Sequence, residues 1–425
     1  MYASYLKHDF RISKHNTKTM PLFKLIDFIL DKKPTYAPTD PKARLWFGRA
    51  LCTRLDLLLP LISIVLNVTD IVLDLLVALE HWRRKDYIWF TLTVLIVVIS
   101  SVVVQIYSAY KLWERVVMNK WLEKIGIKTN AISYIMHVFQ LGQALRFWRI
   151  FRTVRRIRAL DDTHDDEQTK MQKQRLLIDQ QLSVRLLGVL TAFMEDAPQT
   201  VLQLYILVIS MRWEWTQGNI LMTVNILKSL AMFSLSLVGY AKYTHLADAD
   251  VRPLPVCAEI GLFSWIFFCL VSRVVSLVVF ASVFKGLLFA MTMVHFVLSI
   301  IILYPQECDY FQNSRVKSFL FKLAIAYIHQ FSFFPLAACR TRRYSIPYHF
   351  IILIENAAMV IFWGLYTYYS TDSIIAVAVV VGVAFMIGIS SMVCYYNCPV
   401  YCHPSRPQAN QIPDFKPYTI YETAV

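Results

Sequence analysis

Long apolar runs recur along this chain, and they constrain its fold more than any other feature. A helix of about 20 apolar residues crosses the ~30 Å hydrocarbon core of a bilayer, so each run predicts a membrane span. With 57% hydrophobic and 17% charged residues, the composition does not fit the surface of a water-soluble protein. We therefore predict an all-α polytopic membrane protein. Its eight predicted spans are residues 57–79, 88–110, 184–211, 219–243, 257–282, 286–304, 348–369 and 374–394.

Two further segments, 131–151 and 320–339, are apolar but interrupted by polar side chains. We predict that each is a re-entrant helix that enters and leaves on the cytosolic side. The long basic stretches then stay inside, as the positive-inside rule requires, whereas two full crossings would place four arginines outside: Arg152, Arg155, Arg156 and Arg158. Both termini are then cytosolic. No removable signal peptide is expected, because no apolar run with a cleavage site precedes the first span.

The weaker helix is the third of five in each half, which suggests a diverged internal repeat. Glu195 in the fourth helix of the first half corresponds to Glu355 in the fourth helix of the second. The predicted parts are a cytosolic N-terminal segment (1–52), a first helical repeat (53–250), a second helical repeat (251–396) and a cytosolic C-terminal tail (397–425).

The net charge of +14 comes mainly from basic residues beside the spans, where anionic lipid headgroups of the inner leaflet are the expected partner. Membrane phospholipids are therefore predicted partners, and nucleic acid is not. The eight cysteines are too scattered for a disulfide framework. The chain has no phosphate loop, metalloprotease helix, nucleophile elbow or dinucleotide fingerprint, so we expect no enzymatic activity, no cofactor and no metal.

Polar side chains follow one face of the first span, at intervals of 7, 4, 3 and 4 residues. They are Asp56, Ser63, Asn67, Asp70 and Asp74. At 1.5 Å per residue this ladder is about 27 Å long, which is nearly the thickness of the hydrocarbon. In addition, Asn67 begins a glycosylation sequon, but a site within a span is out of reach of the glycosylation machinery.

The span 184–211, which is the fourth helix when the weak segment is counted, repeats the pattern with Glu195, Gln199 and Gln203, and Pro198 beside them loosens the helix. Cations also occur within the apolar segments, at Arg146, Arg185, Lys228, Lys242 and Arg273. A charge at mid-bilayer costs at least about 2.5 to 3.5 kcal/mol, so these groups should face one another or water.

Two interpretations of these buried charges stay open. In one, Asp70, Asp74 and Glu195 neutralise arginines 146, 185 and 273 in a network that only fixes helix packing. In the other, a continuous polar strip lets lipid headgroups cross while their tails stay in the membrane, which a ladder of full thickness favours. The candidate lipid-path residues are Asp56, Asn67, Asp70, Asp74, Arg146, Arg185, Glu195, Asp196, Gln199, Gln203, Arg273 and Glu355.

Arginines at every third position, from Arg146 to Arg158, are also typical of a voltage-sensor helix. The apolar part before them is short and no potassium-channel filter sequence occurs, so an ion channel is the least favoured class. We predict instead a basic helix that lies on the inner leaflet.

The segment 193–206, Phe-Met-Glu-Asp-Ala-Pro-Gln-Thr-Val-Leu-Gln-Leu-Tyr-Ile, resembles the fourth-helix motif of the XK-related family. Further similarities occur at 70–74, 137–143, 272–277 and 354–358. The resemblance implies eight spans with two re-entrant helices. It also implies a plasma-membrane phospholipid scramblase that exposes phosphatidylserine in apoptosis, gated by caspase cleavage or a partner. Its matching motifs place Asp70, Asp74, Glu195, Asp196 and Arg273 on the lipid path.

Other members of that family act beside a partner, which makes a non-transporting scaffold for a lipid-transfer or signalling protein the alternative function. A single-span membrane subunit is a further expected partner. The outer loop at Ser370–Ser373 has no cysteine, so the disulfide that tethers XK to Kell has no obvious equivalent. Candidate caspase positions are Asp165, which Asp166 follows awkwardly, and Asp414 in the tail.

The chain ends in a Thr-x-Val-carboxylate pattern at Thr423 and Val425, which PDZ domains bind by strand addition. Three juxtamembrane cysteines near the end of the last span are candidates for palmitoylation. They are Cys394, Cys398 and Cys402. Zinc binding together with His403, or no modification, are the alternatives for this cluster.

Overall fold

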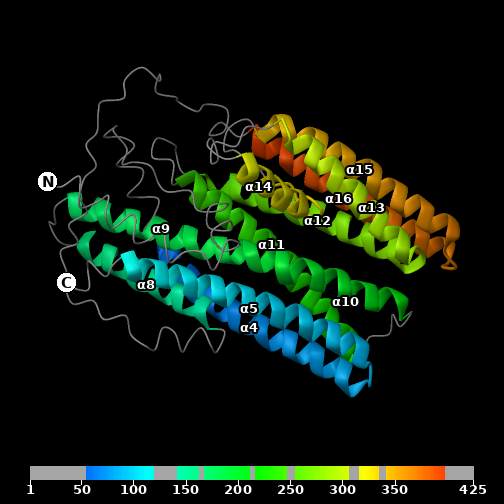
Figure 1. Cartoon of the computed structure of the whole chain (residues 1–425), viewed down its shortest axis with the longest axis horizontal. Coiled ribbons are helices and arrows are strands. Elements are labelled where there is room, and N and C mark those ends of the chain that lie inside the picture. Colours follow the sequence, from blue (N-terminus) through cyan, green and yellow to red (C-terminus); the bar gives the residue numbers. More distant parts are fainter. Residues whose placement is uncertain are drawn as a thin grey trace.

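The computed structural model describes residues 54–118, 141–161, 167–210, 216–246, 254–305, 315–334 and 341–397. These residues form helices and connecting turns, with no strand among them. Eight helical segments within the described ranges are long and apolar enough to cross a membrane, and each overlaps one predicted span. The predicted fold class and span count are therefore confirmed. Figure 1 shows the long helices lying side by side along the long axis of the molecule.

The first half contains α4 (Arg54–Arg83), α5 (Tyr87–Met118), α8 (Gly142–Asp161), α9 (Glu167–Thr191), η1 (Ala192–Asp196), α10 (Ala197–Ile209) and α11 (Gln217–Leu246). The second half contains α12 (Val256–Val283), α13 (Lys285–Leu303), α14 (Arg315–Ile328), α15 (Thr341–Tyr366) and α16 (Thr371–Tyr396). The end of α9, η1 and α10 form one span, Leu176–Ile209. The internal repeat stays a prediction.

A single π-helical turn, η1, interrupts the span Leu176–Ile209 at the place where the sequence predicts a loosened helix. The backbone N–H of Ala197 donates to the carbonyl of Ala192, five residues back. Pro198, the next residue, has no N–H to continue the regular pattern. Such turns insert one extra residue into an α-helix and often occur at functional sites. Here the turn carries Glu195 and Asp196, both buried.

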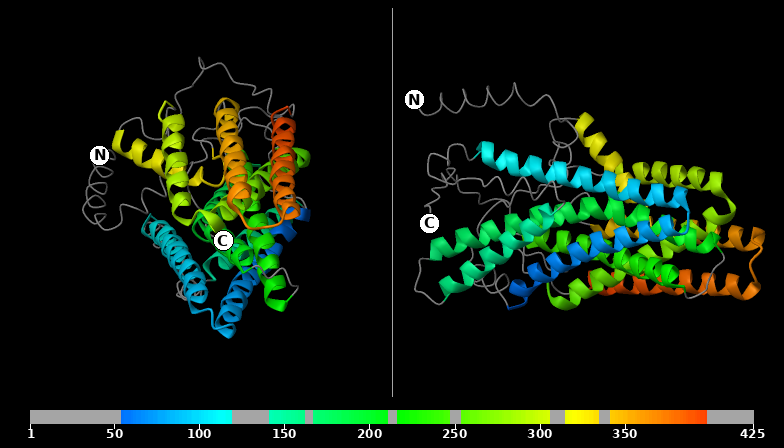
Figure 2. Two further views of the ribbon diagram at one scale, coloured as in Figure 1. Left: turned by 90° about the vertical axis from the view of Figure 1, so that its right-hand side faces the viewer. Right: turned by 90° about the horizontal axis from the view of Figure 1, so that it is seen from below.

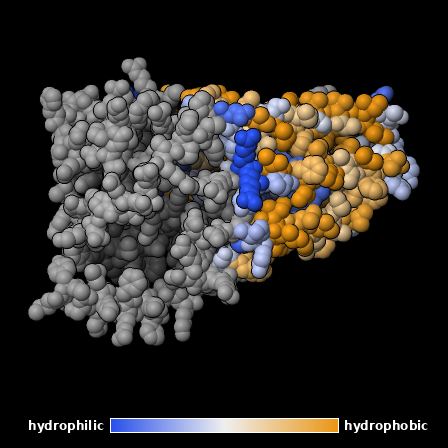
Figure 3. Space-filling model, turned by 90° about the horizontal axis from the view of Figure 1, so that it is seen from above, coloured by the Kyte–Doolittle hydropathy of each residue, from blue (hydrophilic) through white to orange (hydrophobic). Residues whose placement is uncertain are grey.

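Helix α12 is the central helix of the described bundle, packing against α10, α11, α13, α15 and α16. Helices α4, α5, α13 and α16 are mostly unburied along their apolar windows, so they are the helices that face lipid. Figure 1 shows α4 and α5 on the side of the bundle opposite α15 and α16, and Figure 2 shows the same helices from two further sides. Most of the coloured surface in Figure 3 is apolar, as a surface that faces lipid requires. It also carries a patch of hydrophilic residues.

The contact of α12 with α16 is close because Gly388 has no side chain. A Cβ at Gly388 would lie 2.6 Å from Cys269 Sγ and 3.1 Å from the backbone nitrogen of Cys269. We therefore expect Gly388→Ala to destabilise the protein by about 1 to 3 kcal/mol through overpacking. Thermal unfolding in detergent measures this loss. Gly382→Ala, on the same helix but with no atom within 4 Å of the added Cβ, is the matched control.

Helix α14 lies along α13 and ends in a turn near the middle of that helix. Lys322 Nζ donates to the carbonyl of Tyr304 at 2.7 Å, beside the end of α13. After α14 ends, Gln330 Nε2 donates to the carbonyl of Thr292, twelve residues further back along α13, at 3.1 Å. The described part of the predicted segment 320–339 therefore turns beside the middle of α13, and its re-entrant course stays a prediction. Of the other weak segment, 131–151, residues 131–140 lie outside the described residues.

The prediction that the arginine-rich helix lies on the inner leaflet is wrong in one respect. The apolar face of α8 is buried in the protein, where Ile150, Val154 and Ile157 pack against Leu177 and Ile178 of α9. That face is therefore not available to the bilayer. Arginines 152, 155 and 156 are exposed on the opposite side.

Short polar turns connect the spans at the end of the bundle that we predict to be extracellular. Helix α4 ends where Lys85 adopts a left-handed conformation (φ 63°) and Asp86 N–H donates to the carbonyl of His81. Between α15 and α16, the hydroxyl of Tyr369 donates to the carbonyl of Val208 at 2.6 Å and so links the two halves. Desolvation raises the pKa of Tyr369, which keeps this hydroxyl protonated as a donor.

Candidate functional site

Three carboxylates from two helical segments meet in the interior of the first half. Asp70 and Asp74 lie one turn apart on α4, and Glu195 lies in the π turn. One oxygen of each lies within 4.8 Å of the others. All three side chains are buried, with 9%, 2% and 8% of their surface exposed. Like charges so close in a low dielectric repel strongly, so the cluster needs positive or hydrogen-bonding partners.

Lys228, in the middle of α11, supplies the positive charge. Its ammonium pairs with Asp70 Oδ1 and lies 3.4 Å from Asp74 Oδ1. Two amides complete the shell of Asp74, because Gln199 Nε2 and Asn225 Nδ2 donate to the same oxygen at 2.9 and 3.1 Å. Asn225 lies three residues before Lys228 and therefore on the same helical face.

Glu195 accepts a hydrogen bond of 2.9 Å from the hydroxyl of Ser100 on α5. Asp70, Asp74 and Glu195 form a group in the described structure that could hold a metal ion, since carboxylate oxygens are the ligands that hard cations prefer. In this arrangement the single ammonium of Lys228 already contacts two of the three carboxylates.

One of the two interpretations drawn from the sequence pairs these acids with Arg146, Arg185 and Arg273. The structure shows that these are the wrong partners. Lys228 pairs with Asp70 and Asp74, and Arg273 pairs with Glu355 in the other half. Register between helices decides which charges meet, and helical periodicity in one chain does not determine that register.

Polar contacts continue from the acid cluster toward the end of the bundle that we predict to be cytosolic. Asn67 Nδ2 donates to Gln143 Oε1 at 3.1 Å, and Gln143 Nε2 donates to Thr191 Oγ1 at 3.0 Å. One turn along α8, Arg146 donates to the hydroxyl groups of Ser108 and Ser183, both at 2.9 Å.

Arg185 lies in the same region between two aromatic rings. Its guanidinium carbon is 5.8 Å from the ring centroids of Phe147 and of Tyr243, which is within cation–π range. Gly239 leaves room for it, since a Cβ there would lie 2.7 Å from Arg185 Cδ. The Nε of Arg185 is buried and has no hydrogen-bond partner among the described residues.

Toward the other end, three helices carry a buried polar side chain about two turns beyond the acid cluster. His81 lies seven residues after Asp74, Thr93 seven before Ser100 and Gln203 eight after Glu195. Their side chains are at most 1% exposed. Both ring nitrogens of His81, the hydroxyl of Thr93 and both amide atoms of Gln203 lack hydrogen-bond partners in the described structure. We call the polar groups from Arg146 and Asn67 through the acid cluster to these three residues the polar seam.

At its outer end the polar seam meets Arg84, just after α4. Arg84 Nε pairs with Glu80 Oε1 at 2.8 Å, and Arg84 Nη1 donates to Asn219 Oδ1 at 3.3 Å. Gly218 allows this placement, because a Cβ there would lie 2.0 Å from Arg84 Nη2. The guanidinium therefore joins α4 to the start of α11.

A second buried charged cluster lies in the other half of the bundle. Arg273 Nη1 pairs with Glu355 Oε2 at 2.8 Å, and its Nε donates to the carbonyl of Gln330 at 3.1 Å. Glu355 also contacts His295 Nδ1 at 2.9 Å, and Asn356 Oδ1 accepts from Arg273 at 3.2 Å. Arg273 thus ties α12 and α15 to the turn after α14.

The sequence-predicted residues therefore fall into two groups. Asn67, Asp70, Asp74, Arg146, Arg185, Glu195, Asp196, Gln199 and Gln203 lie in the first half, whereas Arg273 and Glu355 form the second cluster. Cys394 is exposed on α16. The side chain of Asp56 lies outside what is described, as do residues Asp165, Cys398, Cys402, Asp414, Thr423 and Val425.

Several residues that matter here were missing from the predicted site. The sequence predicts that Lys228 is a buried cation, but it does not identify Lys228 as the partner of the acids. Asn225 and His295 are polar residues inside spans, so their position was the available signal. Ser100 and Thr93 offer no such signal in the sequence, because hydroxyl groups in membrane helices commonly bond to their own backbone.

Comparison with known families gives one result. The model of a family described as XK-related protein matches residues 58–404, from the first span to just beyond α16. The matched region includes the polar seam and the second cluster.

Proposed function

The chain belongs to the XK-related protein family, and on that premise we propose that it is an energy-independent phospholipid scramblase. The headgroup would cross along the polar seam while the acyl chains stay in the bilayer. Scrambling in a plasma membrane would expose phosphatidylserine, with apoptosis as the setting and cleavage or a partner as the trigger. Both termini would be cytosolic.

The observation that carries this proposal is the row of buried polar atoms without partners at His81, Thr93 and Gln203. A network that served only to fix packing should be satisfied, because each unpaired buried polar group costs about 1 to 3 kcal/mol. These three groups continue the polar seam outward from the acid cluster on three different helices. Polar groups of that kind suit a passage that a headgroup or water enters transiently.

The acid cluster explains why such a passage would be closed at rest. Lys228 pairs with Asp70 and Asp74. The side-chain amides of Gln199 and Asn225 donate to Asp74, so both carboxylates already have partners. A zwitterionic headgroup offers an ammonium and a phosphate, so it would replace Lys228 at the acids and pair with Arg146 or Arg185. Gating would then consist of separating α11 from α4.

The two weak helical segments would be re-entrant. For the second, the contacts of α14 with α13 at Tyr304 and Thr292 support this arrangement. The turn after α14 is held by Arg273, so movement of this helix would be transmitted to α12 and α15.

A second function, a scaffold that docks a lipid-transfer or signalling protein or a single-span subunit without moving lipid, is favoured by one observation. Every carboxylate of the acid cluster has a charged or hydrogen-bonding partner. A fully paired cluster serves a rigid docking platform equally well.

Reconstitution separates the two functions. Purified full-length protein and a form without residues 398–425 would be placed in vesicles that contain a dye-labelled phospholipid, and external dithionite would be added. We expect the inner-leaflet dye to become accessible with at least one form, without ATP. Protection of the inner-leaflet dye with both forms, at verified insertion, would contradict the scramblase and support the scaffold.

A further inference from the structure

A groove between α12 and α16 opens on the apolar surface, away from the polar seam. Its volume is about 730 Å³, within the range of about 300 to 1,000 Å³ that holds one small ligand. Small side chains create it, at Gly261 and Ser264 on α12 and at Gly382, Ser390 and Ser391 on α16. Its walls present mostly apolar surface, which favours an apolar occupant.

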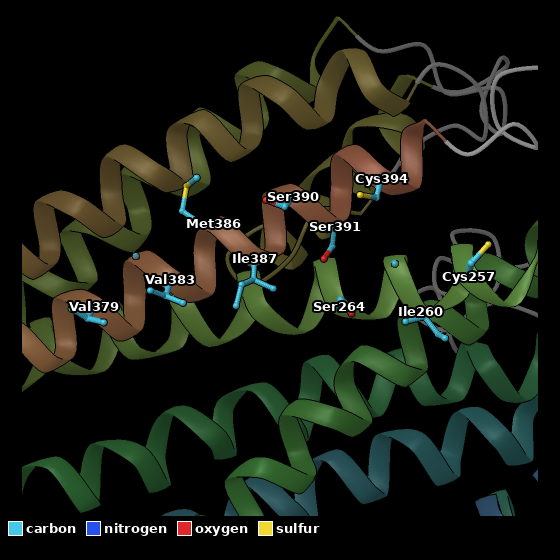
Figure 4. Close-up of a pocket in the computed structure, with 12 residues that line it drawn as sticks. Cys257, Ile260, Ser264, Val379, Val383, Met386, Ile387, Ser390, Ser391 and Cys394 are labelled. Carbon is cyan, nitrogen blue, oxygen red and sulfur yellow. The ribbon is translucent and has the colours of Figure 1, made fainter.

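Two free thiols line the same end of this groove, one from each wall. Cys257 is the second residue of α12, and Cys394 lies three residues before the cap of α16 at Asn397. Both are exposed. Figure 4 shows them at one end of the groove and Val379 at the other. We predict this end to be cytosolic, where acyl-CoA and membrane acyltransferases meet juxtamembrane cysteines.

The groove is long enough for an acyl chain that begins at these thiols and spans one leaflet. From Cys394 to Val379 the groove follows fifteen residues of α16, or about 22 Å at 1.5 Å per residue. One leaflet accounts for about 15 Å of a ~30 Å hydrocarbon core. Because the groove is longer than one leaflet is deep, it can hold a chain attached at the membrane surface through the whole depth of that leaflet.

We propose that Cys257 and Cys394 are S-acylated and that a thioester-linked fatty acyl chain occupies the groove between α12 and α16. The thiolate sulfur attacks the carbonyl carbon of a long-chain acyl-CoA, a new carbon–sulfur bond forms, and the bond to coenzyme A breaks. Coenzyme A leaves as its thiol with the proton that the cysteine lost. No oxidant or reductant is required. The chain covers the small residues of both walls and holds α12 against α16. This inference is independent of lipid scrambling.

The test follows both the thioester and the location of the chain. Cells that express the full-length protein would be fed a palmitate analogue that carries a photoreactive diazirine and a click handle. Hydroxylamine-dependent mass tagging counts thioesters, and irradiation followed by peptide mapping locates the chain. We expect cross-links to α12 and α16 beside the groove. In Cys257→Ala/Cys394→Ala, both the tags from these positions and the cross-links should disappear.

Filling the groove gives a second, independent readout. A Cβ at Gly382 meets no atom within 4 Å, so Gly382→Leu should fill the groove without disturbing the fold. The thioesters should remain while the cross-links to α12 and α16 are lost. Gly286→Leu, also in open space but on α13, is the matched control and should behave as wild type.

Two results would overturn the proposal. Unchanged tagging in the double cysteine variant would show that neither thiol is acylated. Cross-links that persist in that variant would show that the groove holds free membrane lipid instead of a covalently attached chain.

Discussion

Lys228→Met is expected to remove most of the folded protein. It leaves three carboxylates within 4.8 Å of one another without their cation. Breaking a buried ion pair by removing one partner costs about 3 to 5 kcal/mol, a large share of a typical total stability of about 5 to 15 kcal/mol. Fluorescence-detected size exclusion and thermal unfolding in detergent measure the loss.

Two variants make this result specific to the acid cluster. Lys242→Met removes a lysine of the same helix whose pair with Glu259 is about a quarter exposed, so it should cost no more than about 1 kcal/mol. Asp70→Asn/Asp74→Asn/Lys228→Met removes both signs of charge and should regain much of the folded yield. If Lys228→Met is as stable as Lys242→Met, the acid cluster does not depend on Lys228.

Arg273→Met should be destabilising to a similar degree, because Arg273 makes three different contacts. Its guanidinium is 2% exposed and binds Glu355, Asn356 and the carbonyl of Gln330. Loss of this group leaves a buried carboxylate with His295 as its remaining ionisable partner in the described structure. About 3 to 5 kcal/mol is expected, measured by thermal unfolding.

Arg273→Met/Glu355→Gln is the compensating variant, since an amide can still bond to His295 without a buried charge. It should recover part of the loss. Arg273→Lys should recover less, because an ammonium does not reproduce the fork of donors. Equal stability of Arg273→Met and wild type would show that the second cluster does not hold the turn after α14.

Much of the fold follows from the sequence because the bilayer requires it. Backbone groups in hydrocarbon must be paired within a helix, so each long apolar run predicts a helix and little else is permitted. The span predicted at 184–211 has the largest error at its start, since it begins at Leu176, eight residues earlier than predicted. Those residues are partly covered by α8, so they do not need the uniform apolar character of a lipid-facing helix.

The site was less predictable than the fold. Spacing placed Asp70 and Asp74 on one face of α4 and indicated a disturbed helix at Pro198. It did not predict that the disturbance is a π turn, nor that Lys228 and not an arginine pairs with the acids. Both depend on how neighbouring helices are rotated and shifted against one another, and a single sequence contains no direct record of that.

The most direct test of the polar seam as the lipid path compares two threonines of α5. Thr93 is fully buried without a hydrogen-bond partner, whereas Thr91 is exposed and bonds to the carbonyl of Tyr87. Gln203→Met provides a second variant within the seam. Because the hydroxyl of Thr93 and the amide of Gln203 have no partner in the described fold, removing them should leave stability unchanged or improved.

Scrambling rates in reconstituted vesicles, measured with an active form of the protein, give the decisive result. If each group binds a crossing headgroup with about 1 to 2 kcal/mol, Thr93→Val and Gln203→Met should each slow scrambling by about 5- to 30-fold. Thr91→Val should scramble at the wild-type rate. Wild-type rates in all three variants, with intact folding, would contradict a lipid path along the polar seam.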